Sequence, residues 1–342
     1  SIVALRKCDT QTIYDLIPDD VTVDTLSFTG LFSFRAWVKL LRLINNTKPD
    51  LIMSSLFLSN TVVRILYPLH RVPVIAREHN VYFHKRKWQI FLDRILAPLS
   101  QTIVAVSNEV ADFTSQQEKI PRNKFTVINN GVDIVKADMH LSSVDRVKVR
   151  SEIGLASNDK VALFVGRLVP QKGLDSLIKG FALFYKNNPN WKLVIVGDGH
   201  LDEQLKKLTD YLSLISAVRF VGEQKNVPQY YAIADCLVST STTEGMSNVH
   251  LEALAHGVPI ITTRTGGTSA IVIEGETGLI IEEPTPQNVR LSLNQFCNAS
   301  SQNMKQASLK HRNHFTIEET TEQYKLLFQK SVIQTYSTCE KN

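Results

Sequence analysis

Short β-branched runs alternate with longer amphipathic stretches through the second half of the chain. The amphipathic stretches predict helices over residues 174–187, 201–213 and 248–256. Alternating strands and helices favour a parallel, doubly wound sheet, which binds its ligands at the carboxyl ends of the strands. The runs with the length and composition of buried strands are Val161–Val165, Lys192–Val196, Val218–Val221, Cys236–Ser239 and Pro259–Thr262.

The first half repeats this pattern less regularly, so two similar α/β domains are expected. Asn129–Gly131 closes the last strand of that half, and the polar residues 132–147 are interpreted as a linker. The segment Thr316–Lys330 opens with a Thr-x-x-Glu capping box and predicts a final helix with an apolar face. The strands expected in the first half are Asp50–Ser54, Pro73–Ala76, Thr102–Val106 and Lys124–Ile128.

Length and composition agree with two globular domains. The chain has 342 residues, of which 43% are hydrophobic and 21% charged, so disorder as a class is excluded. No run of 18 apolar residues is present, so by the criterion of hydropathy a helix that spans a bilayer is not expected. The four cysteines are scattered and form no C-x-x-C pair, which favours a reducing, cytoplasmic setting without a zinc or redox motif.

The net charge of +5 lies in the first half. Residues 1–150 hold 20 Lys and Arg against 14 Asp and Glu, whereas residues 151–342 hold 18 against 19. Nucleic acid is not expected as a partner, because aromatic and basic residues are not interleaved. Lys85, Arg86 and Lys87 lead directly into Trp88, a pattern that suits a helix lying on an anionic membrane. A solvated basic turn explains the same residues equally well.

The first group of residues with candidate chemistry lies between a strand and a helix. Gly166 and Arg167 are followed by Lys172 and Gly173. Arginine can grip a diphosphate with a fork of donors, lysine adds a point charge, and glycine lets the backbone come close. A diphosphate site is therefore indicated, although a surface loop with two cations explains this group alone.

The second group surrounds the start of the short helix 248–256. Ser247 or Asn248 can cap this helix, Gly257 ends it, and the backbone N–H groups of residues 245–248 then form an anion site. Glu244 precedes the helix and Glu252 lies one turn inside it. Two carboxylates in these places suit hydrogen bonds to sugar hydroxyls better than binding of a metal, and two unrelated surface acids are the alternative.

Together these motifs resemble the donor half of the family 4 retaining glycosyltransferases, which have the GT-B architecture. The motifs follow one another in the family's order and at its spacing. They are Gly166, Arg167 and Lys172, then Gly197-Asp-Gly199, Glu244-x7-Glu252 and Thr265-Gly-Gly267. Arg77-Glu-His79-Asn80, Val104–Ser107, Ile128–Asp133 and the final helix match further family motifs, so the resemblance covers nearly the whole chain.

The resemblance implies a role for each matching residue. Arg167 and Lys172 would bind the nucleotide diphosphate and stabilise its charge as it leaves. Glu252 would hold the ribose hydroxyls, and Glu244 would hold the donor sugar. His79 would reach from the first domain to that sugar and to the leaving phosphate. The backbone around the ligand would be supplied by Gly166, Gly197, Gly199, Gly245, Met246, Ser247 and Asn248. No Asp-x-Asp motif is present, so no metal cofactor is expected and the cationic side chains would take its place.

The chain departs from the family pattern at two places. Ala270 stands where the family usually has a glutamate after its Gly-Gly motif. The family's first strand, its glycine-rich loop and its first helix would precede Ser1. We therefore expect an N-terminally truncated chain whose first half folds poorly and which transfers little.

The sequence thus predicts two Rossmann-like domains that face each other across a cleft, with an acceptor-side domain over 1–140, a donor domain over 141–315 and a C-terminal helix over 316–342 that crosses back. The expected activity is retaining transfer of a sugar from a nucleotide sugar to a polysaccharide or lipid-linked hydroxyl, in the cytoplasm or at its membrane. A nucleotide-sugar 2-epimerase is one alternative, which would need further acids and histidines in the cleft. A non-catalytic nucleotide-sugar-binding subunit is the other.

Overall fold

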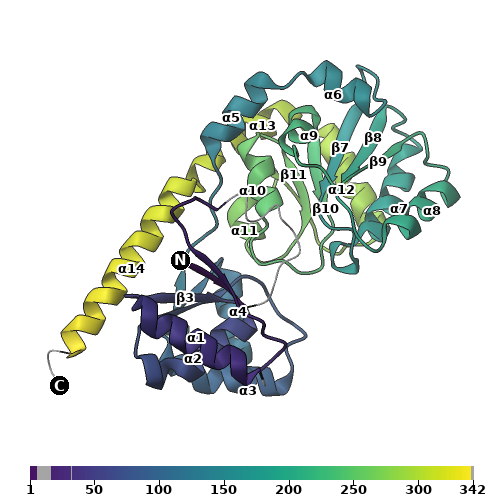
Figure 1. Cartoon of the computed structure of the whole chain (residues 1–342). Coiled ribbons are helices and arrows are strands. Elements are labelled where there is room, and N and C mark those ends of the chain that lie inside the picture. The colour runs from purple at the N-terminus through teal and green to yellow at the C-terminus, as the bar shows by residue number, and fades with distance from the viewer. Residues whose placement is uncertain (6–16, 32, 340–342) are drawn as a thin grey trace. The chain divides into compact units, whose positions relative to one another are not determined.

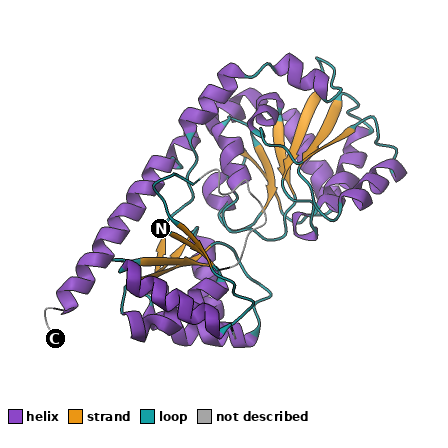
Figure 2. Ribbon diagram, in the orientation of Figure 1, coloured by secondary structure: helices purple, strands orange, loops and turns teal. Residues whose placement is uncertain are grey.

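The computed structural model describes residues 1–5, 17–31 and 33–339, with side chains up to residue 334. The chain divides into two compact units (Figure 1). The first contains Ser1–Ala105, Ala111–Val127 and Tyr324–Asn342, and the second contains Val106–Val110 and Ile128–Gln323. Each unit is built on a parallel sheet with helices packed against it, so the expected α/β class is confirmed (Figure 2).

The first unit is built around a four-stranded parallel sheet in the order β3-β4-β5-β6, and β1 and β2 form a separate parallel pair. Helix α1 is amphipathic because Ala36, Leu40 and Ile44 recur at every fourth position, and all three are buried on one face. The elements are β1 (Ile2–Ala4), β2 (Val23–Thr25), α1 (Phe34–Thr47), β3 (Ile52–Ser55), α2 (Phe57–His70), β4 (Val74–Glu78), α3 (Lys87–Leu96), η2 (Ala97–Leu99), β5 (Thr102–Ala105), α4 (Asn108–Glu118), η3 (Arg122–Lys124) and β6 (Phe125–Val127).

The second unit contains a six-stranded parallel sheet in the order β12-β11-β10-β7-β8-β9. The central strand β7 is buried on both faces, as its apolar composition predicts, since all but its first and last residues are buried. The strands are β7 (Lys160–Val165), β8 (Trp191–Val196), β9 (Val218–Gly222), β10 (Cys236–Ser239), β11 (Ile260–Thr263) and β12 (Gly278–Ile281).

The helices of this unit pack on both sides of the sheet. Phe181 and Phe184 of α7 and Phe296 of α12 pack together in one apolar core with strands β7 and β8. The helical segments are α5 (Ile134–Ser143), α6 (Arg146–Glu152), η4 (Pro170–Lys172), α7 (Leu174–Tyr185), α8 (Asp202–Tyr211), α9 (Pro228–Ile233), α10 (Asn248–Ala255), α11 (Thr268–Ile271), α12 (Pro286–Asn298), α13 (Ser301–His311), η5 (Arg312–His314) and the first residues of α14 (Ile317–Cys339).

The strands expected from the sequence are all present, within a few residues of their predicted bounds. The interpretation of residues 132–147 as a linker is wrong, because this stretch forms α5 and the start of α6. Asp133 and Asp145 cap these helices by accepting hydrogen bonds from the backbone N–H groups of Lys136 and Lys148.

The last helix begins where its capping box predicts. The Thr316 hydroxyl accepts a hydrogen bond from the backbone N–H of Glu319 at 3.1 Å. Residues of α14 from Tyr324 onward belong to the first unit, where Arg77 lies 5.5 Å from the ring of Tyr324 and Gln101 donates to the carbonyl of Ser331. None of the described helices combines the length and the hydropathy that crossing a bilayer requires.

Candidate functional site

The sheet order of the second unit places its candidate residues at a topological switch point. β7 lies between β10 and β8, and the chain proceeds from β7 to β8 and β9 on one side and later to β10, β11 and β12 on the other. In open parallel sheets the crevice at such a point, outside the carboxyl ends of the strands, is where ligands bind. The loops that follow β7, β8 and β10 carry the predicted donor-site residues of this unit, apart from Asn248 and Glu252, which lie in the helix that follows the β10 loop.

Two glycines let these loops approach one another closely. Gly173 has φ +65°, and a Cβ there would lie 2.3 Å from the carbonyl oxygen of Thr240. Gly197 has φ +134°, and a Cβ there would lie 2.0 Å from the carbonyl oxygen of Gly166. No side chain fits either contact, so the loop after β7 packs against both the β10 loop and the β8 loop without intervening side chains.

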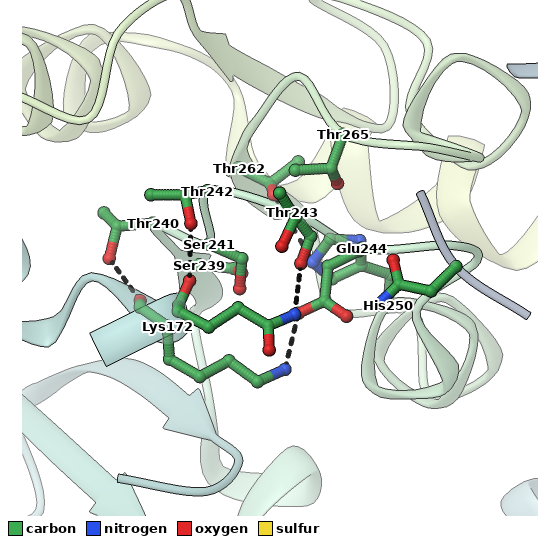
Figure 3. A network of polar contacts seen from close by, with 12 residues as sticks. Lys172, Ser239, Thr240, Ser241, Thr242, Thr243, Glu244, His250, Thr262 and Thr265 are labelled. Atoms are coloured by element: carbon green, nitrogen blue, oxygen red, sulfur yellow. Dashed lines mark hydrogen bonds and ion pairs between the residues drawn. The ribbon is translucent and has the colours of Figure 1, made fainter. Parts of the chain in front are cut away.

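An ion pair joins the loop that follows β7 to the loop that follows β10. Lys172 Nζ lies 2.6 Å from Glu244 Oε1, and both side chains are 15% exposed (Figure 3). The backbone beneath the pair is held by the Thr240 hydroxyl, which donates to the Lys172 carbonyl at 3.0 Å. Gln171 Nε2 donates to the Thr243 carbonyl at 2.6 Å. The structure therefore brings together two residues that the sequence placed in one site.

The charge of Lys172 also acts on a buried histidine beneath the site. His250 of α10 is 1% exposed, and its Nε2 lies 3.3 Å from the Thr262 hydroxyl. Burial, and then the nearby charge of Lys172, lower the pKa of His250 to about 3. His250 is neutral at physiological pH, so it leaves Lys172 as the positive charge of this part of the site.

Arg167 is exposed on the same loop. Among the described residues it takes part in no ion pair, so its guanidinium is available to an anionic ligand. Gly197, Asp198 and Gly199 follow β8 beside it, where the backbone N–H of Leu168 donates to the Asp198 carbonyl at 2.8 Å. The cations predicted for the diphosphate thus lie on one loop, one exposed and the other paired with Glu244.

The β10 loop leads into α10 as predicted. Gly245 and Met246 precede Ser247, which is the N-cap residue, although its hydroxyl makes no capping hydrogen bond. Asn130, to which the sequence assigned no role, donates from Nδ2 to Asn248 Oδ1 at 2.9 Å and to the Met246 carbonyl at 3.3 Å. This asparagine therefore holds the loop from the side through two donated hydrogen bonds.

Glu252 lies within α10, one turn below this loop. Its Oε2 accepts a hydrogen bond from the Tyr231 hydroxyl at 2.8 Å. Burial raises the pKa of Glu252, and the hydrogen bond from Tyr231 offsets part of the rise. Tyr231 belongs to α9 and carries no recognisable motif signal, so sequence reasoning did not find it.

The loop after β11 is braced by a residue that the sequence did not suggest. Glu109, which belongs to the second unit, accepts hydrogen bonds from the backbone N–H of Gly267 at 3.3 Å and from the Ser269 hydroxyl. Partial burial raises the pKa of Glu109, but these and its other hydrogen bonds bring it below the ordinary value. Ala270 stands where the family usually has a glutamate, and in this chain the carboxylate of Glu109 braces the Gly-Gly loop from another segment.

His79 follows β4 in the first unit. Burial, and then the charge of Arg77, lower the pKa of His79 to about 4, so the imidazole is neutral at pH 7. At that pH it can donate or accept a hydrogen bond but does not supply a positive charge. Its predicted contact with the donor sugar stays a prediction.

The predicted basic surface is partly wrong. Lys85 is not a surface cation, because its side chain is 6% exposed and pairs with Asp93 at 2.6 Å and with Glu118. Burial lowers the pKa of Lys85, but the charges of Glu78, Asp93 and Glu118 raise it by more. Arg86 and Lys87 are exposed, and Trp88 is 46% exposed.

A cavity of about 640 Å³ lies at the opposite, amino ends of the strands of the second unit. Its lining includes Arg150, Lys160 and Lys305 and none of the predicted donor-site residues. Within the described part of the chain, no group of three or more His, Cys, Asp or Glu side chains is placed to hold a metal ion.

Comparison with known proteins gives two family models that match different parts of the chain. The model described as "Glycosyl transferases group 1" matches residues 145–313, and "Glycosyltransferase Family 4" matches residues 10–136. HepE of Anabaena, solved in complex with UDP, has a TM-score of 0.80 at 22% identity and covers 91% of this chain and 86% of its own. At that identity the likeness shows the fold.

Three curated relatives are similar over part of their length. The D-inositol 3-phosphate glycosyltransferase of Corynebacterium glutamicum is 27% identical over 69% of this chain and 61% of its own. The alpha-monoglucosyldiacylglycerol synthase of Acholeplasma laidlawii is 31% identical over 47% and 41%. The lipopolysaccharide core biosynthesis mannosyltransferase LpsB of Rhizobium meliloti is 30% identical over 57% and 53%. The chain thus spans less than two thirds of the length of each.

Proposed function

The chain belongs to the family 4 glycosyltransferases, and from this we propose that it transfers a sugar from a nucleoside-diphosphate sugar to an acceptor hydroxyl with retention of the anomeric configuration. The observation that carries the proposal is the Lys172–Glu244 pair at the switch point of the second unit. It places a cation for the diphosphate directly beside a carboxylate for the sugar.

Lys172 and Arg167 hold the diphosphate and stabilise the charge that develops on it as it leaves. Because both are cationic side chains, they supply the stabilisation for which other transferases use a divalent metal, and we propose that transfer needs no metal. Gly166, Gly197 and Gly199 allow the backbone to approach the phosphates. UDP in the complex of the similar HepE supports a nucleotide as the ligand.

The remaining polar groups hold the two ends of the donor. Glu252 accepts hydrogen bonds from the ribose hydroxyls. Glu244 and the backbone N–H groups of residues 245–248 hold the sugar. We also assign His79 of the first unit to the sugar. Because its imidazole is neutral, it acts as a hydrogen-bond donor and not as a positive charge.

The chemical step follows from the state of these carboxylates. Glu244 is paired with Lys172 and held for the sugar hydroxyls, and Glu252 is bonded to Tyr231 and assigned to the ribose, so we assign neither carboxylate the role of a nucleophile. We therefore favour attack by the acceptor hydroxyl on the face from which the diphosphate departs. The bond from the anomeric carbon to the acceptor oxygen forms as the bond to phosphate breaks, and the hydroxyl proton passes to the leaving phosphate oxygen.

We assign the acceptor to polysaccharide or lipid-linked glycans. The names of two relatives support this assignment, since one makes a glucosyl diacylglycerol and another acts in lipopolysaccharide core synthesis. Exposed aromatic and cationic side chains of α3, among them Trp88, Arg86 and Lys87, further support a contact with the cytoplasmic face of a membrane.

The diphosphate assignment is tested by calorimetric binding of UDP, GDP and ADP to the Arg167→Ala and Lys172→Ala variants. Loss of a charge-assisted hydrogen bond of about 1.5–3 kcal/mol should weaken the tightest nucleotide at least tenfold in each. Lys179→Ala is the control, because Lys179 is an exposed cation of the next helix that pairs with Asp175 and should matter less than twofold. Wild-type affinity in both site variants would refute the assignment.

A further inference from the structure

The carboxylate assigned to ribose is held on one side by a buried tyrosine. The Tyr231 hydroxyl donates to Glu252 Oε2 at 2.8 Å, and Tyr231 is only 1% exposed. Glu252 Oε1 makes no hydrogen bond to any described residue. One oxygen of the carboxylate is therefore fixed by the protein, and the other remains able to accept hydrogen bonds from a ligand.

Tyr231 is itself held in place by the helix that carries Glu252. Its ring stacks on the ring of His256 at 5.1 Å between centroids, with an interplanar angle of 27°. His256 Nδ1 donates to the main-chain carbonyl of Glu252 at 2.7 Å, since a carbonyl can only accept. The ring of His140 lies parallel to that of His256 at 6.3 Å. Stacked rings thus support the hydroxyl that reaches Glu252.

Without this hydroxyl the Glu252 side chain could adopt other rotamers, because no other described side chain bonds to its carboxylate. A carboxylate that must first be ordered binds its ligand more weakly than one already in position. Among the described residues the buried Tyr231 hydroxyl bonds only to Glu252, so it orients that acceptor strongly.

We infer that Tyr231 is a positioning residue for ribose recognition, which fixes Oε2 of Glu252 so that Oε1 faces the ribose hydroxyls of the donor. This inference rests on the proposed function, in which Glu252 binds the ribose. It predicts that loss of the Tyr231 hydroxyl lowers discrimination between a ribonucleotide and its deoxy analogue, rather than affinity for nucleotides in general.

The test uses whichever of UDP, GDP and ADP binds the wild-type chain most tightly, together with the 2′-deoxy and 3′-deoxy analogues of that nucleotide. Calorimetry should show about a tenfold preference of the wild type for the ribonucleotide over the analogue that lacks the bonded hydroxyl. Tyr231→Phe keeps the ring and its stacking on His256, and should reduce the preference to about twofold. Affinity for the deoxy analogue itself should change less than twofold.

Tyr230→Phe is the matched control. Tyr230 precedes Tyr231 on the same short helix and is 4% exposed, but it makes no hydrogen bond to Glu252. This variant should keep the whole tenfold preference.

Three results would contradict the inference in distinguishable ways. A wild type that binds the ribonucleotide and both analogues equally would show that Glu252 does not read the ribose, and the proposed function would lose that assignment. A wild type that discriminates while Tyr231→Phe discriminates equally would refute only the positioning role. Equal weakening of the ribonucleotide and the analogues in Tyr231→Phe would show a structural role alone.

Discussion

Burial decides the charge of several histidines in this protein. Burial lowers the pKa of His250 to about 3 and that of His79 to about 4, with nearby cations adding to the effect in each case. Burial also lowers the pKa of His256. All three are therefore neutral near pH 7, and the positive charge of the candidate site comes from Lys172 and Arg167. Protonation of these histidines at low pH therefore destabilises the folded state.

His250 should make the folded state sensitive to acid. Its pKa in the folded state is about 3, well below the ordinary value of 6.5, so between these values the unfolded chain binds a proton that the folded chain does not. Stability then falls as the pH falls, by about 2 kcal/mol between pH 7 and pH 5 from this residue. His250→Gln removes the titrating group, and urea unfolding at the two pH values should show a correspondingly smaller loss. An identical loss in both proteins would contradict the buried, neutral imidazole.

The sequence predicted individual site residues where a motif names them, as it did for Lys172 and Glu244. It missed Tyr231 and Glu109, and it gave no role to Asn130 of the Ile128–Asp133 motif, because each reaches the site only through the packing of a distant segment. The error at Lys85 has the same cause: Glu118, one of the two carboxylates that pair with it, lies 33 residues away. Local charge patterns do not show which cations the fold will bury.

Helix α3 presents an apolar face that the described part of the chain leaves about half exposed. Trp88, Phe91 and Ile95 are 46%, 61% and 49% exposed, at the spacing of one helix face. Arg86 and Lys87 are exposed at the start of the same helix. Aromatic side chains beside cations suit the interface of an anionic bilayer.

Sedimentation with phosphatidylglycerol vesicles tests this contact. Arg86→Gln with Lys87→Gln should remove about 2 kcal/mol of attraction, or about thirtyfold in affinity, because each cation near such a surface contributes about 1 kcal/mol. Lys136→Gln with Lys148→Gln is the control, since these cations are 74% and 70% exposed on the second unit. Equal binding by the two double variants would argue against α3 as the contact.

Elements with strong patterns were predictable, and short ones were less so. The composition of the buried strands β7 and β8 predicts them directly. Strand β12 was not predicted, since it has only four residues and pairs along one side with β11. Helix α5 and the start of α6 were interpreted as a linker because residues 132–147 are polar. Their capping aspartates, Asp133 and Asp145, were the available signal.

At the scale of the whole molecule, topology assembles the candidate site. Lys172 and Glu244 are 72 residues apart in the chain, and their side chains meet because β7 and β10 are neighbours in the sheet. The sequence could predict which strand ends carry polar residues. It could place them together only through the rule that parallel strands share a carboxyl edge and through the family resemblance.

The binding of a nucleoside diphosphate at this edge is most directly tested by peptide-resolved hydrogen exchange of the full chain, with and without saturating UDP, GDP or ADP. Bound nucleotide should slow exchange of backbone amides in peptides that cover residues 166–173 and 244–252, since these loops lose access to solvent and to local opening. Protection that instead falls on the cavity at the opposite ends of the strands, in peptides covering residues 146–160 and 301–309, would contradict a donor site at the switch point.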